Sequence, residues 1–144
     1  MAQSNTAVSI GIAARPAVKT VTVTRAAHQA YVILRLGFIA APIVAGLDKF
    51  FHLLVNWDQY LAPSVNTLLG GQGHTFMLAV GVIEIIAGIG VAIKPRLFAY
   101  VVAAWLWGII ANLLMIPGYF DLALRDFGLS LGALALARLS AELD

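Results

Sequence analysis

Four long apolar stretches constrain this chain more than any other feature of its sequence. They cover approximately residues 30–54, 75–93, 97–116 and 119–139. At about 1.5 Å of rise per residue, a helix made from each stretch crosses about 30 Å of hydrocarbon. Charged residues make up only 11% of the 144-residue chain and hydrophobic residues 61%. Because soluble domains carry roughly 25% charged residues, we predict an all-α integral membrane protein folded as a bundle of four transmembrane helices.

The segments between these stretches predict how the helices connect. Residues 94–96 (Lys-Pro-Arg) and 117–118 (Pro-Gly) form tight breaks, so the helices on either side should be adjacent and antiparallel. The one long connection, residues 55–74, contains Trp57 and Tyr60, and we expect a short interfacial helix followed by a flexible glycine-rich turn. Residues 1–28 lack the continuous apolar core of a signal peptide. They are expected to be a retained cytoplasmic tail, and residues 29–144 the transmembrane domain.

Positive charges predict the orientation of the bundle, because cytoplasmic loops are enriched in lysine and arginine. Lys49 and Arg125 fall on one side of the bundle. With a cytoplasmic tail, both termini are cytoplasmic and the connection 55–74 is on the outer side of a bacterial-type inner membrane. The opposite, cytoplasmic side then holds six cations: Arg15, Lys19, Arg25, Lys94, Arg96 and Arg138.

Small residues predict where the helices touch, since close backbone approach drives helix packing in lipid. The candidate stripes are Gly37, Ala41 and Ala45 on the first helix; Gly128, Gly132 and Ala135 on the fourth; and, on the third, either Ala99 with Ala103 or Ala104 with Gly108. Helical spacing continues the first stripe to Asp48 and then His52. Both of these side chains are therefore expected to point into the bundle.

Glu84 lies near the middle of the second apolar stretch, between Gly81 and Gly88. A charge at the bilayer centre costs about 2.5–3.5 kcal/mol on insertion scales, so this carboxyl group needs a partner or a function. Counting residues from the helix ends favours Arg35 as its partner over Lys49. Glu84 is either an interhelical lock or a carboxyl group that carries protons or accepts a ligand. The candidate intramembrane polar site comprises Glu84, Arg35, Lys49, Asp48 and His52.

A second polar group is expected toward the outer surface, formed by Asn112, Asp121, Arg125 and Asp126. Asp121 precedes Arg125 by four residues, which is the favourable order for an ion pair on one helix. We interpret this group as an ion network that joins the helix ends.

Several kinds of chemistry are not expected from this sequence. The chain has no cysteine, which excludes disulfides, thiol relays and cysteine-bound metal centres. His52 and His74 follow no metal-binding spacing, so we expect no metal and no intrinsic cofactor. The net charge of +2 is too small and too scattered for nucleic-acid binding. No nucleotide-binding glycine motif, HExxH motif or nucleophile elbow is present.

The chain resembles the DoxX-like family of small four-helix membrane proteins. The resemblance rests on Arg35, on the end of the first helix at residues 46–50 (GLDKF), on residues 81–88 (GVIEIIAG) and on the small residues of the last helix. It implies a membrane subunit associated with redox chemistry, because the named member belongs to a thiosulfate:quinone oxidoreductase. Lys49 and Glu84 match the family pattern, and Arg35 matches less closely. The cluster from Asp121 to Asp126 and the long N-terminal tail have no counterpart in it.

Three functions remain open at this point. The favoured one is an accessory or structural subunit, without activity of its own, that docks in the bilayer with protein partners in a larger redox or electron-transfer complex. The second is a quinone-reactive oxidoreductase subunit in which Glu84 and His52 handle protons. The third is a small proton-coupled transporter with Glu84 as its proton site.

Overall fold

The computed structural model describes residues 24–144, and every regular element in this range is a helix. The long helices are α1 (Arg25–Phe51), α3 (Gly73–Ile93), α4 (Pro95–Leu114) and α5 (Phe120–Leu143), with two short ones, η1 (Trp57–Tyr60) and α2 (Pro63–Leu68), between α1 and α3. The all-α prediction is confirmed for this range. Most of the expected N-terminal tail lies outside the described residues. Three helices, α1, α3 and α4, are long and apolar enough to cross a membrane.

Local sequence signals mark the start of α1, the break between α3 and α4, and the turn before α5. Thr24 caps α1, because its hydroxyl accepts a hydrogen bond from the Ala27 amide. Lys94 alone separates α3 from α4, and Pro95 occupies the first position of α4, where no amide hydrogen is needed. The turn before α5 contains Gly118 with a φ of 97°, a conformation that glycine adopts without strain. The predicted breaks therefore lie where the helices change direction.

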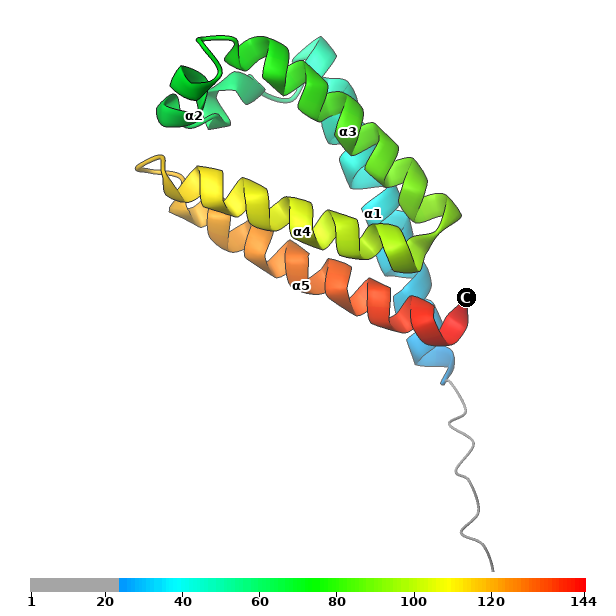
Figure 1. Ribbon diagram of the computed structural model, residues 1–144. Coiled ribbons are helices and arrows are strands. Elements are labelled where there is room, and N and C mark those ends of the chain that lie inside the picture. The colour runs from blue at the N-terminus through cyan, green and yellow to red at the C-terminus, as the bar shows by residue number, and fades with distance from the viewer. Residues whose placement is uncertain (1–23) are drawn as a thin grey trace, which may run out of the picture.

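The four long helices form two antiparallel pairs (Figure 1). Helix α1 packs along α3, and α4 packs along α5. Figure 1 shows α3 and α4 converging at the Lys94 turn and diverging toward their other ends. A hydrogen bond from the Tyr31 hydroxyl to Asp144 Oδ1, 2.9 Å long, brings the start of α1 to the end of α5. The α1 start, the α3–α4 turn and the α5 end therefore share one end of the molecule.

The backbones of helices α1 and α3 pack closely together at two glycines, Gly46 and Gly81. A Cβ added to Gly46 would lie 2.5 Å from the Gly81 carbonyl oxygen, and one added to Gly81 would lie 2.8 Å from the Gly46 oxygen. Further along, Gly88 packs against Ile43. The predicted stripe of Gly37, Ala41 and Ala45 is wrong, because a Cβ on Gly37 would meet nothing within 4 Å. The contact face of α1 lies instead along Ile39, Ile43 and Gly46.

The predicted stripe on α5 is also wrong in part. Gly128 and Ala135 are exposed, and only Gly132 approaches another helix, with 3.3 Å from an added Cβ to Phe38. The buried face of α5 is formed by Ala123, Asp126, Ser130, Ala133, Leu136, Ala137 and Ser140. On α4 the structure selects Ala99 and Ala103, which are fully or almost fully buried in the main core. Ala104 and Gly108 face outward.

Candidate functional site

A buried ion pair joins α1 to α3 in the interior of the molecule. Lys49 Nζ lies 2.6 Å from Glu84 Oε2, and the two side chains are only 2% and 10% exposed. A buried charge that lacks a partner is strongly destabilising, so each residue of the pair requires the other. The Lys49–Glu84 pair is therefore an interhelical lock in this structure.

Arg35 is not the partner of Glu84, contrary to the sequence-based prediction. Its guanidinium donates hydrogen bonds to the Ala92 carbonyl oxygen, at 2.7 Å, and to the Tyr31 hydroxyl, at 2.8 Å. The reason lies in side-chain direction, because Cα–Cβ bonds tilt toward the N-terminus of their own helix. In the antiparallel α1–α3 pair, Lys49 and Glu84 therefore lean toward each other. Arg35 leans toward the start of α1, away from Glu84.

Asp48 and Trp57 connect this ion pair to the loop that follows α1. The Asp48 carboxylate accepts hydrogen bonds from the amides of Leu53 and Leu54 at 2.8 and 2.9 Å, and from Trp57 Nε1 at 2.7 Å. The Trp57 ring covers the Lys49 ammonium group, which lies 3.8 Å from the ring centroid, in a cation–π contact. Asp48 is thus buried, but its carboxylate binds the loop that follows α1 and, in the described part of the chain, does not bind a residue of another long helix.

Helices α4 and α5 add Trp105 and Asp126 to the same interior region. Both side chains act electrostatically on the Glu84 carboxylate. The buried Trp105 Nε1 has no hydrogen-bond partner within residues 24–144. Together with Lys49, Glu84 and Trp57, these residues form a cluster to which η1 and all four long helices contribute. We call these five residues the interior polar cluster.

Asp126 forms an ion pair with its neighbour Arg125. The described residues show no wider ion network around this pair, contrary to the prediction. Arg125 Nε lies 3.1 Å from Asp126 Oδ1, while the Asp126 side chain is 6% exposed. The predicted pair between Asp121 and Arg125 is absent from the described ion pairs. An exposed pair contributes little, whereas a buried carboxylate requires a partner, so Arg125 neutralises Asp126. Asp121 remains exposed in the first turn of α5, where a negative charge stabilises the helix.

Asn112 has a different role from the predicted one. Its Oδ1 accepts a hydrogen bond from the Ala62 amide at 2.9 Å, and its Nδ2 donates to the Tyr60 carbonyl oxygen. Asn112 therefore binds the backbone of the loop after η1 to the end of α4. The ring of Tyr60 also packs edge-on against Tyr119, with centroids 5.3 Å apart.

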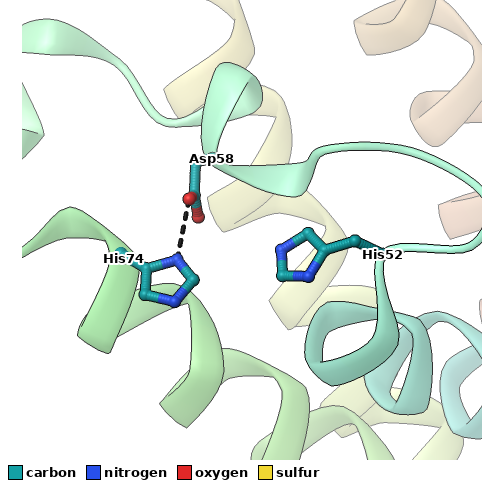
Figure 2. A group of neighbouring side chains, drawn as sticks. All are labelled: His52, Asp58 and His74. Carbon is teal, nitrogen blue, oxygen red and sulfur yellow. Dashed lines mark hydrogen bonds and ion pairs between the residues drawn. The ribbon is translucent and has the colours of Figure 1, made fainter.

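His52 does not point into the bundle, because α1 ends one residue earlier. His52 adopts the left-handed conformation with φ of 51°, so helical spacing no longer predicts its direction. Figure 2 shows its imidazole facing a second group, Asp58 and His74, which are joined by a hydrogen bond of 2.7 Å. His52 thus belongs to the loop surface rather than to the interior polar cluster.

The structure therefore divides the predicted site residues among several places. Lys49, Glu84 and Asp126 belong to the interior polar cluster, and Asp48 supports the cluster from the end of α1. Arg35, His52, Asn112 and Asp121 lie elsewhere. Sequence reasoning missed the cation–π contact of Trp57 with Lys49, although an aromatic residue placed near an expected lysine is a signal for such a contact.

The chain was compared with models of known protein families, with curated proteins and with solved structures, and none of the three comparisons finds a match.

Proposed function

We propose that this chain is an accessory membrane subunit, without enzymatic activity of its own, that docks through outward-facing helix surfaces to a larger membrane complex. The redox or electron-transfer character of that complex rests on the resemblance to the DoxX-like family. The observation that carries the docking proposal is the set of small residues that the chain does not use in its own packing.

These small residues lie on α4 and α5. Ala104, Gly108 and Ala111 follow one another at helical spacing on α4, and all three are exposed. A Cβ added to Gly108 or to Gly128 would meet nothing within 4 Å. In lipid, small residues permit close approach of a neighbouring helix, and such contacts drive association there. The α4–α5 pair therefore offers surfaces suited to a helix of another subunit.

The proposal includes α5 as a fourth transmembrane helix. It has 24 residues, enough for about 36 Å at 1.5 Å per residue, and it packs along α4. Its exposed charges lie toward its ends, where Arg125 and Arg138 can extend to the membrane surface. The segment 127–137 between them has no charged residue. Both termini are then cytoplasmic, and the connection between α1 and α3 is on the outer side of the cell membrane.

The experiment is purification of the full chain in a mild detergent, followed by native mass spectrometry. We expect a defined complex with other membrane subunits, whose redox cofactors are identified by absorbance. Gly108→Leu and Gly128→Leu should each weaken this complex without unfolding the chain, since both side chains enter open space.

Gly37→Leu is the matched control, because Gly37 is an equally open glycine on α1, outside the α4–α5 surface. It should leave the complex intact. A wild-type chain that stays a lone monomer contradicts the proposal. So does a complex that survives both the Gly108→Leu and the Gly128→Leu substitutions unchanged.

The quinone-reactive and transport alternatives both require Glu84 to exchange protons. Glu84 is buried and bound to Lys49 at 2.6 Å, and this contact supplies the partner that a carboxylate in lipid needs. We therefore base the proposed function on docking and not on Glu84 chemistry.

A further inference from the structure

We propose that His52, Asp58 and His74 form a binding site for one divalent transition-metal ion of the Zn²⁺ or Fe²⁺ class. Each residue offers one ligand atom, and these atoms all lie within 4.8 Å of one another. Figure 2 shows the two imidazoles and the carboxylate facing a common space. This inference departs from the expectation of no metal, and it is independent of the proposed docking function.

Three separate elements supply the ligands. His52 is the residue at which α1 ends, Asp58 is the second residue of η1, and His74 is the second residue of α3. The antiparallel packing of α1 and α3 brings the end of one helix beside the start of the other. For this reason two histidines without a metal-binding sequence spacing become neighbours, with ring centroids 5.9 Å apart and planes 21° from parallel.

The chemistry of the three side chains suits such an ion. Imidazole nitrogens and a carboxylate oxygen are the ligands of many zinc sites and of iron(II) sites with open positions. His74 Nδ1 already lies 2.7 Å from Asp58 Oδ2. On binding, the two atoms move apart to about 3.3 Å to hold the ion, and the hydrogen between them shifts to the imidazole Nε2. Asp58 Oδ1 is buried and has no hydrogen-bond partner within the described range of the chain, so this carboxylate keeps one acceptor atom unused at the site.

The required movement is small. In a tetrahedral site with bonds of about 2.0–2.1 Å, ligand atoms lie about 3.3 Å apart. No separation between the ligand atoms exceeds 4.8 Å, so none has to shrink by more than about 1.5 Å. The side chains of His52 and His74 are exposed and free to rotate by that amount.

The backbone that carries these ligands is held in place by other polar side chains. Asp48 binds the amides of Leu53 and Leu54 just after His52. Asn66 Oδ1 accepts from the Gly73 amide at 2.9 Å, next to His74, and Asn112 binds the backbone that follows η1. Supporting hydrogen bonds of this kind maintain the geometry of metal sites. A pocket of about 280 Å³ opens beside Asp58 and His74, with room for water molecules to complete the coordination.

The competing explanation is that the Asp58–His74 hydrogen bond only fastens the loop to α3. That explanation leaves the His52 side chain only its stacking on the His74 ring, because it makes no hydrogen bond within residues 24–144. His52 also stands at a left-handed position that glycine or asparagine usually fills. His52 is therefore the residue that distinguishes a metal site from a simple loop contact.

The test uses the full chain, purified in detergent without a histidine tag and freed of metal with a chelator. Co²⁺ binding is followed by visible absorption, and Zn²⁺ binding by calorimetry. We expect one ion per chain with a dissociation constant in the micromolar range or tighter. His52→Asn, Asp58→Asn and His74→Gln should each weaken binding at least about tenfold. Zn²⁺ should also raise the melting temperature of the wild type, because it binds the folded state.

Two control variants match the ligand variants in chemistry but lie elsewhere. His28→Asn removes an exposed histidine at the start of α1, and Asp121→Asn removes an exposed carboxylate of α5. Both should bind Zn²⁺ like the wild type. His52→Asn is the decisive variant, because asparagine tolerates the left-handed conformation and the Asp58–His74 bond is kept. Wild-type affinity in this folded variant, or an equal loss of affinity in His28→Asn, would overturn the proposal.

Discussion

At the residue scale, the interior of the protein depends on a chain of contacts that begins near the end of α1. The Asp48 carboxylate holds the Trp57 indole, the Trp57 ring covers the Lys49 ammonium group, and Lys49 neutralises Glu84. Each contact satisfies a charge that would otherwise be costly away from water. Glu84 therefore joins α1 to α3 through Lys49, and the same lysine connects it to Trp57 in η1.

Removing one member of the ion pair should destabilise the protein more than removing both. Lys49→Met leaves Glu84 as a buried charge without its partner, and we expect the free energy of unfolding to fall by about 3–5 kcal/mol. The double variant Lys49→Met with Glu84→Leu has no such charge and should regain most of this loss. Unfolding in detergent, followed by circular dichroism, measures both. Equal losses in the single and double variants would contradict the assignment.

At the element scale, the α1–α3 pair is defined by the crossing at Gly46 and Gly81. The absence of side chains at both positions lets the backbones approach closely enough for Lys49 to reach Glu84. Small residues have this effect in membrane helices generally. The sequence analysis identified Gly81 as a small residue on the same helix as Glu84. It did not identify Gly46 as the residue of α1 that packs against Gly81.

A bulky residue at this crossing should separate the two helices. A Cβ on Gly46 would already lie 2.5 Å from the Gly81 oxygen, so Gly46→Leu should lower the free energy of unfolding by at least about 1–3 kcal/mol. Gly37→Leu adds the same side chain to the same helix at an open position, and its effect should stay within about 0.5 kcal/mol. Thermal unfolding of the two variants side by side tests this difference. Similar stabilities would mean that α1 and α3 do not cross at Gly46.

At the scale of the whole molecule, the two ends differ in character. One end carries the start of α1, the α3–α4 turn and the end of α5, with the cations Lys94 and Arg96 exposed in the turn. The other end carries η1, α2 and the His52–Asp58–His74 group, bound to the tip of the α4–α5 pair through Asn112. The first end is the one that we propose faces the cytoplasm.

This orientation can be measured because the chain has no cysteine. Gln72→Cys places a thiol at the exposed turn before α3, and Arg96→Cys places one at the exposed start of α4. A maleimide that does not cross membranes should label Gln72→Cys in intact cells and Arg96→Cys only after the cells are opened. The reverse pattern would show the opposite orientation, and labelling of both in intact cells would contradict a membrane between them.

The sequence by itself determined the helical class and the breaks between α3 and α4 and between α4 and α5, whereas α1 begins and ends earlier than predicted and α5 ends later. These properties depend on local causes: the length of apolar stretches, the prolines at Pro95 and Pro117, and the glycine turns. It also identified Glu84 as a residue that needs a partner, since the cost of a charge in lipid is independent of the fold.

Only the tertiary structure decided which residues meet. The register of α1 against α3 is fixed by the contact between Gly46 and Gly81. In this register Glu84 forms its ion pair with Lys49, and Arg35 donates a hydrogen bond to the Ala92 carbonyl oxygen. The same packing brought His52 beside His74, 22 positions further along the chain. Apolar periodicity could not predict either contact, because it describes which face of a helix is buried and not how far one helix is shifted along the next.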